Sequence, residues 1–209
     1  MFTINIKQFL LRSLMSITGL VLLSFGAALS ETMGMGLDPY TAFSTGFSTL
    51  FGLSLGNFIL ILNIIIVAVV VFFDRSRIGW GTLYNLVMVG YMIEFFMSFF
   101  SNIFDVTQMN LMVRLLITIV AIAIFTFGVA LCMDSNLGVS PYDAVAPIIV
   151  SFTSKKFTIV RITQDVLVVL VAWIIGGPVG ISTFVTGFLA GPLIEFYSSH
   201  ITRKLASKI

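Results

Sequence analysis

The stretch Asp38 to Ala42, which reads Asp-Pro-Tyr-Thr-Ala, returns at an offset of 102 as Ser140 to Ala144, which reads Ser-Pro-Tyr-Asp-Ala. Each copy places a capping oxygen directly before a proline, a pattern typical of a helix start. The apolar segments that follow, Pro39 to Phe51 and Pro141 to Thr153, are too short to cross a bilayer core of about 30 Å at about 1.5 Å per residue. We predict that both are re-entrant helices, which enter the membrane without crossing it.

The composition around these stretches is that of a membrane protein. Of the 209 residues, 58% are hydrophobic and only 10% are charged, and the mean hydropathy is +1.11. A soluble domain has about 25% charged residues, so the composition excludes a soluble enzyme, a nucleic-acid-binding module and a disordered chain. The net charge of +2 is small and the basic residues lie at segment ends, so no nucleic-acid partner is expected.

Six apolar stretches are long enough to cross the bilayer as helices. They are Ser13 to Ser30, Asn57 to Phe73, Gly79 to Phe100, Leu111 to Met133, Ile159 to Ile175 and Pro178 to Ser199. Together with the two short helices they predict an all-α polytopic membrane protein.

Two further blocks recur along the chain. Ser24 to Leu29 returns as Thr126 to Leu131, and Gly79 to Phe96 returns as Gly180 to Tyr197. Three blocks in the same order at nearly constant spacing indicate an internal repeat, in which each half consists of span, short helix, span and span. We predict one membrane domain, 1–209, with a first repeat at 8–104, a second at 105–200 and a cytoplasmic tail at 201–209.

The distribution of basic residues decides whether the two halves are parallel or inverted. If the short helices turn back and the N-terminus is cytoplasmic, ten of the eleven basic residues lie on the inner side, which satisfies the positive-inside rule. Only Arg114 lies outside. A parallel arrangement instead places Arg75 and Arg77 outside, in a short loop where the rule is strongest. We therefore predict two inverted three-span repeats with both termini in the cytoplasm.

This architecture predicts a conduit. A helix that ends at membrane depth needs protein or a wet cavity around its free backbone groups. Two half-helix starts that enter from opposite faces are a recurring way to build a substrate site near the midplane. We expect a transporter or channel for a small solute. The alternative is a non-transporting accessory protein that supports another membrane or biosynthetic complex.

Glycine- and proline-containing blocks are spread along the chain. They are Gly36 to Tyr40, Leu53 to Gly56, Gly79 to Leu83, Leu137 to Asp143, Gly176 to Thr183 and Gly191 to Glu195. In these blocks the chain resembles the YczE/YitT-type family of bacterial integral membrane proteins. The resemblance implies a multi-span fold in the bacterial cytoplasmic membrane, and it carries over no catalytic residue and no substrate. The family often has tryptophan after the motif proline, where this chain has Tyr40 and Tyr142, so a site lined by this aromatic would differ in selectivity.

The two half-helix starts supply the first candidates for a substrate site or pathway. They are Asp38, Pro39, Tyr40, Ser140, Pro141, Tyr142 and Asp143. The carboxylates of Asp38 and Asp143 fall at the positive ends of the short helices, where capping alone accounts for them. The functional alternative is cation or proton binding, because a carboxylate at half-membrane depth is costly unless it is paired or hydrated.

Two further acidic positions are equivalent in the repeat. Glu94 and Glu195 lie late in the third and sixth spans. One interpretation is that each side chain reaches the headgroup layer, Glu94 on the outer side and Glu195 on the inner side. The alternative is that both face the protein interior and together handle protons or cations.

The fifth span opens with a polar patch formed by Arg161, Gln164 and Asp165. Arg161 and Asp165 are four residues apart and share a helix face, so an ion pair is expected. The alternatives are an arginine that extends to the cytoplasmic surface with its partner, and a substrate-facing cluster with Gln164.

No pattern predicts an enzyme. The one histidine, His200, lies near the C-terminal end, so there is no Ser/His pair and no histidine-rich metal site. We expect no catalytic residue, no metal and no cofactor. The expected partners are the lipid bilayer and a small solute, with a homo-oligomer or a membrane partner left open.

Overall fold

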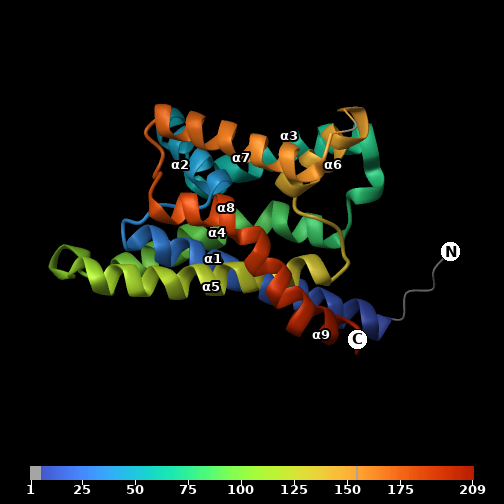
Figure 1. The fold of residues 1–209 in the computed structure, drawn as a ribbon, viewed down its shortest axis with the longest axis horizontal. Coiled ribbons are helices and arrows are strands. Elements are labelled where there is room, and N and C mark those ends of the chain that lie inside the picture. The colour runs from blue at the N-terminus through green and yellow to red at the C-terminus, as the bar shows by residue number, and fades with distance from the viewer. Residues whose placement is uncertain (1–5, 154) are drawn as a thin grey trace.

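The computed structural model describes residues 6–153 and 155–209, and all the regular elements in these ranges are helical (Figure 1). The α-helices are α1 (Ile6–Thr32), α2 (Pro39–Phe51), α3 (Leu55–Asp74), α4 (Trp80–Ser101), α5 (Leu111–Asp134), α6 (Pro141–Thr153), α7 (Phe157–Ile174), α8 (Ile181–Tyr197) and α9 (Arg203–Ala206). Figure 1 shows them in two layers, with α2, α3, α6 and α7 in one layer and α1, α4, α5 and α8 in the other.

Helices α1 and α5 cross with their backbones in direct contact. A Cβ atom added at Gly26 would lie 2.5 Å from the carbonyl oxygen of Ala121, and one added at Gly128 would lie 2.5 Å from the amide nitrogen of Leu23. Small residues are what allow membrane helices to approach this closely. Gly26 and Gly128 are also separated by the 102-residue offset of the sequence pattern.

Each short helix packs against a long helix of the other half. Helix α2 lies against α7, and α6 lies against α3. In the second layer α4 packs on α1 and α8 packs on α5. The two halves of the chain therefore form one packed body.

The linkers before the short helices also hydrogen-bond across the halves. Four backbone bonds form two matched pairs. The amide of Gly81 donates to Leu137 (2.8 Å), that of Ser182 to Met35 (2.8 Å), that of Leu37 to Pro178 (3.1 Å) and that of Val139 to Arg77 (3.4 Å). Within each pair, the two donors and the two acceptors are related by offsets of 101 or 102 residues. Each half therefore donates to the other the same bond that it accepts from it.

The bounds predicted for the short helices are confirmed. Helix α2 begins at Pro39, after an extended Asp38 whose side chain accepts the amide of Thr41 at 3.2 Å. It ends before Gly52, which has φ of +65°, a left-handed conformation that favours glycine. Helix α6 likewise begins at Pro141.

Five of the described helices, α1, α3, α4, α5 and α7, are long and apolar enough to cross a membrane. The stretch predicted as a sixth span, Pro178 to Ser199, is wider than the helix that forms there. Helix α8 has 17 residues, because an extended Gly180 precedes it and a π-helical turn, Ser198–Thr202, replaces the α-helix after Tyr197. A sixth span stays a prediction.

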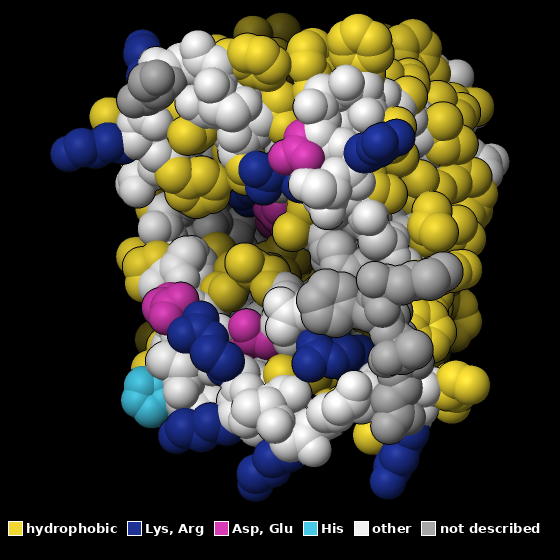
Figure 2. Space-filling view, turned by 90° about the vertical axis from the view of Figure 1, so that its right-hand side faces the viewer, with side chains coloured by type: hydrophobic (Ala, Val, Ile, Leu, Met, Phe, Trp, Pro, Cys, Tyr) yellow, Lys and Arg dark blue, Asp and Glu magenta, His cyan; other side chains and the backbone are white. Residues whose placement is uncertain are grey.

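The outer surface fits a lipid environment. Large apolar side chains such as Phe72, Trp173 and Ile174 are 84%, 70% and 75% exposed. Exposure on this scale is unfavourable in water and natural in a bilayer. Figure 2 shows one end of the molecule, with Lys and Arg side chains gathered on it and a hollow near its centre in which charged side chains are visible. The chain is a multi-pass helical membrane protein.

Candidate functional site

Two tyrosines meet where the short helices begin. The rings of Tyr40 in α2 and Tyr142 in α6 have centroids 4.9 Å apart, with an angle of 32° between their planes. The prolines before them, Pro39 and Pro141, are buried and are the first residues of their helices. The sequence-predicted half-helix starts are therefore brought together.

Each tyrosine hydroxyl is held by the helix that follows in its own half. Tyr40 donates to Oδ1 of Asn63 in α3 at 2.7 Å, and Tyr142 donates to Oδ1 of Asp165 in α7 at 2.5 Å. Donor and acceptor are 23 residues apart in both cases. Asn63 was not among the sequence-predicted site residues. The signal that could have found it is that Tyr40 and Asn63 are separated by the same 23 residues as Tyr142 and Asp165.

An ion-pair cluster surrounds Tyr142. Nη1 of Arg161 lies 2.6 Å from Oδ1 of Asp143, and its Nε lies 3.2 Å from Oδ2 of Asp165. The guanidinium also lies over the Tyr142 ring, 4.9 Å from its centroid, which adds a cation–π contact. Nε2 of Gln164 donates to the backbone oxygen of Tyr142 at 3.2 Å. The expected ion pair of Arg161 with Asp165 is confirmed, whereas its bond to Asp143 was not foreseen.

The cluster is accessible from outside the protein. The side chains of Arg161 and Asp143 are 30% and 33% exposed, and that of Asp165 is 12% exposed. With all three groups ionised, one positive and two negative charges leave a net charge of −1. A partly exposed cluster with surplus negative charge can exchange its internal contacts for a cationic group.

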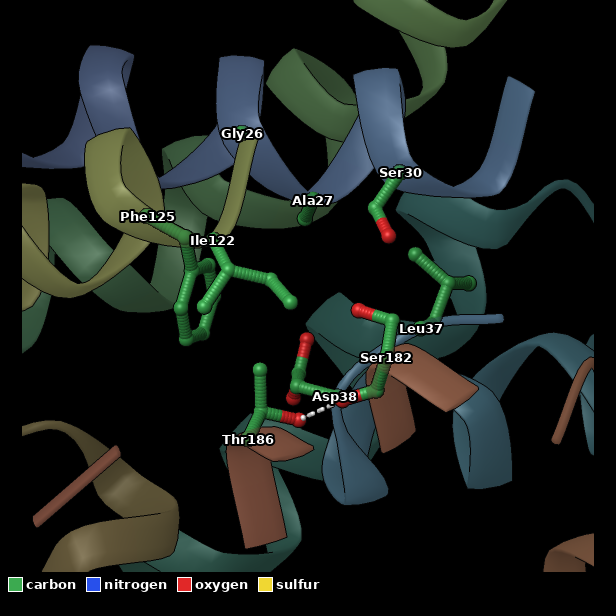
Figure 3. Close-up of a pocket in the computed structure, with 9 residues that line it drawn as sticks. All are labelled: Gly26, Ala27, Ser30, Leu37, Asp38, Ile122, Phe125, Ser182 and Thr186. Atoms are coloured by element: carbon green, nitrogen blue, oxygen red, sulfur yellow. Dashed lines mark hydrogen bonds between the residues drawn. The ribbon is translucent and has the colours of Figure 1, made fainter. Parts of the chain in front are cut away.

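The caps of the two short helices differ. In α6 the hydroxyl of Ser140 accepts the amide of Asp143 at 3.1 Å and donates to the carboxylate of Asp143 at 2.7 Å. At the start of α2, Oδ2 of Asp38 accepts the amide of Thr41, while Oδ1 is buried without a hydrogen-bond partner among the described residues. Beside Asp38 lies a cavity of about 10 Å³, bordered by α1, α5 and α8 (Figure 3).

The two glutamates do not join the cluster. Oε2 of Glu94 accepts the amide of Gly56 at 3.0 Å, so Glu94 ties α4 to the first turn of α3. Glu195 is 68% exposed near the end of α8, and its carboxylate lies 3.8 Å from Arg203. The structure thus places the equivalent acids in different surroundings.

The class of protein is defined by these features: a multi-pass helical membrane protein with a charged cluster between its helices. More particularly, the chain belongs to the family described as "Family of unknown function (DUF6198)", whose sequence profile matches residues 10–199.

Relatives in two bacterial species cover most of the chain. The "Uncharacterized membrane protein YczE" of Bacillus subtilis is 27% identical over 91% of this chain and 86% of its own length. An "Uncharacterized protein" of Haemophilus influenzae is 26% identical over 88% of this chain and 82% of its own length. "Uncharacterized protein YyaS" of Bacillus subtilis is 23% identical over 91% of this chain and 94% of its own length. The resemblance to the YczE-type family is confirmed, and no solved structure matches the chain significantly.

Proposed function

We propose that this protein moves a small polar solute across a bacterial cytoplasmic membrane. The fold proposed for this task has six spans and two re-entrant helices, α2 and α6, in two inverted three-span repeats with cytoplasmic termini. The matched hydrogen bonds between the linkers support the repeat, because bonds related by one offset are what a pseudo-two-fold axis produces. The basic residues gathered at the end seen in Figure 2 support a cytoplasmic location for that end.

The observation that carries the proposal is the position of Arg161. A guanidinium between Asp143 and Asp165 at the start of a short helix is costly to keep inside a membrane protein. Ionisable groups at such depth usually mark a pathway for a solute or an ion. Helix α6 lies toward the end of the molecule that Figure 2 shows hollowed, so we assign entry of the solute to that side.

The tyrosine pair is the proposed barrier on the far side of the cluster. Tyr40 and Tyr142 come from the two halves, and each is fixed by its own long helix. A relative movement of the halves would separate the rings without breaking either hydroxyl bond. Such a movement is the common basis of alternating access in transporters built from repeats.

A non-transporting accessory role is the second candidate. The small size of the cavity beside Asp38, about 10 Å³, favours it. A cavity of this size holds one water-sized body, not a solute with several heavy atoms.

Uptake into liposomes that contain the purified full-length protein tests the proposal. The probes are guanidinium, choline, glycine and lactate, which cover cationic, zwitterionic and anionic solutes. The surplus negative charge of the cluster predicts uptake of a cation above the level of protein-free liposomes. Asp143→Asn removes the surplus negative charge and leaves Arg161 paired with Asp165. It should lower that uptake by about tenfold or more, since about 1.4 kcal/mol of lost binding corresponds to a factor of ten.

The matched control for this test is Asp105→Asn. Asp105 lies in the loop before α5, where its carboxylate accepts hydrogen bonds from Thr107 and Gln108, away from the cluster. This variant makes the same chemical change and should retain uptake. If none of the four probes enters faster than into protein-free liposomes, the accessory role replaces transport.

A further inference from the structure

The cavity beside Asp38 has an apolar wall and a polar wall, and side-chain oxygen atoms of the polar wall are set to accept. The hydroxyl-bearing residues Ser30, Ser182 and Thr186 border it, and they are 2%, 2% and 7% exposed. The hydroxyl of Ser30 donates to Gly36 at 3.1 Å, and that of Thr186 donates to the backbone oxygen of Ser182 at 2.8 Å. With these protons engaged, both hydroxyls offer lone pairs to any further neighbour.

Asp38 adds a buried carboxyl group to the polar wall. Figure 3 shows this side chain beside Ser182 and Thr186 and pointing into the space that they border with Ser30. None of the ion pairs formed by the described residues includes Asp38. A buried carboxylate that lacks both a counter-charge and a partner for Oδ1 is costly, so the cavity favours a positively charged occupant.

The charge and size of the cavity limit the occupant. One carboxylate balances one positive charge, and the described residues contain no group of three or more His, Cys, Asp and Glu suited to a metal ion. A volume of about 10 Å³ accepts a single water-sized body. Hard cations are bound by carboxylate and hydroxyl oxygens, which are the atoms present here.

We propose that one sodium ion binds between Asp38, Ser30, Ser182 and Thr186. The ligands come from α1, from the linker before α2 and from α8, so the ion connects three elements of the two proposed repeats. If the halves move during transport, these elements separate and sodium affinity changes with them. Sodium binding stands independently of the proposed function, whereas its coupling to a solute rests on it.

Thermal unfolding of the full-length protein in detergent tests the site. Measurements in NaCl, KCl and choline chloride at equal ionic strength separate sodium from potassium and from general salt effects. A ligand that binds only the folded protein raises Tm with its concentration. We expect Tm to rise with sodium concentration, and equilibrium binding of radioactive sodium to saturate at one ion per chain.

Two variants remove the site and one controls for charge. Asp38→Asn keeps a side chain that caps α2 equally well but lacks the charge, and Thr186→Val removes one hydroxyl with the shape preserved. The first should abolish the response to sodium, and the second should weaken it at least tenfold. Asp105→Asn makes the same chemical change in an exposed loop, where hydrogen bonds, chiefly from the Thr107 hydroxyl, hold the pKa of Asp105 below its usual value. It should retain the full response.

Several outcomes would overturn the sodium site. They are equal melting in sodium and choline, an equal response to sodium and potassium, and a sodium response that survives in Asp38→Asn. A protein that responds to pH alone would carry a proton on Asp38 in place of the ion. Because sodium binding is read in detergent and solute uptake in liposomes, either proposal can fail while the other stands.

Discussion

The two halves of the molecule hold their tyrosines in the same way and differ in the charges behind them. Tyr40 donates a hydrogen bond to Asn63, which is neutral and fully buried. Tyr142 instead donates to Asp165, which forms an ion pair with Arg161. At the position equivalent to Arg161, the first half has the buried Ile59. The comparison teaches that two helix pairs can hold a tyrosine by the same kind of bond while only one of them carries ionic groups.

The caps of the short helices differ in the opposite sense. The first half has an acid, Asp38, at the position where the second half has Ser140. At the offset of 101 or 102 residues, Ser30 corresponds to Cys132 and Ser182 to Gly81, neither of which has a side-chain oxygen. The cavity therefore lies beside the start of α2 and draws on both halves, whereas the arginine cluster belongs to the second half alone.

The largest effect is expected when the second half is given the first half's apolar residue, in Arg161→Ile. Without the guanidinium, Asp143 and Asp165 lose their cation. Removing one partner of a fully buried ion pair costs about 3 to 5 kcal/mol. Because Arg161 is 30% exposed, we expect about 2 to 3 kcal/mol less unfolding free energy in detergent, after allowance for solvent screening.

The triple variant Arg161→Ile, Asp143→Thr and Asp165→Asn is the control for this change. It copies the neutral residues of the first half at all three positions. Most of the lost stability should return, because no carboxylate is left unpaired. A triple variant as unstable as Arg161→Ile would contradict the view that the unpaired carboxylates cause the loss of stability.

The reverse exchange, Asn63→Asp, should have the next largest effect. It puts a carboxylate at a fully buried position that has Ile59, and no arginine, at the equivalent of residue 161. An uncompensated buried charge should cost about 2 kcal/mol or more. Acidic buffer neutralises the new carboxylate, so part of the lost stability should return when the variant is melted at low pH. Asp165→Asn, the matched change in the second half, should cost less because its Tyr142 bond survives.

The crossing glycines test the part of the scaffold that the halves share. Ala at Gly26 or at Gly128 brings a Cβ atom to 2.5 Å from a backbone atom of the facing helix. We expect each variant to lose about 1 to 2 kcal/mol by overpacking, and the two losses to be equal within error. Gly191→Ala is the control, since an added Cβ meets nothing within 4 Å, and it should cost nothing. Unequal losses at Gly26 and Gly128 would contradict the conclusion that the two glycines contribute equally to the crossing of α1 and α5.

The smallest expected effect is a difference between two hydroxyl deletions. Tyr40→Phe removes a bond to a neutral amide, and Tyr142→Phe removes a bond to a carboxylate. Hydrogen bonds to charged groups contribute about 1 kcal/mol more to stability than neutral ones. Tyr142→Phe should therefore be the less stable variant by about this amount in parallel melting curves. Equal melting temperatures of the two variants would show that the bond to the carboxylate contributes no more to stability than the bond to the amide.

Local signals predicted part of this structure well. The Asp38-Pro39 and Ser140-Pro141 starts gave the bounds of α2 and α6, since capping and proline geometry act within a few residues. The four-residue spacing of Arg161 and Asp165 predicted their ion pair for the same reason.

Features that depend on helix packing could not be predicted. The pairing of Tyr40 with Asn63 requires knowing how α2 lies along α3, and the cavity of Asp38 requires α1 and α8 to border it. Apolar periodicity does not choose neighbours when every helix is apolar on most sides. The end of α8 was missed too, because the change to a π-helical turn after Tyr197 has no clear local signal.

The exchanged backbone bonds between the linkers bear on how the protein is made. The carbonyl oxygen of Met35 accepts a hydrogen bond from the amide of Ser182. Ser182 leaves the ribosome only when most of the chain has been translated, so this bond forms late. Until then the segment around Met35 lies in the translocon or the lipid, and its carbonyl oxygen lacks the hydrogen-bond donor that it has in the folded protein. Biogenesis of the first half is therefore completed by the second, and a chain truncated before α8 should be a substrate for membrane quality-control proteases.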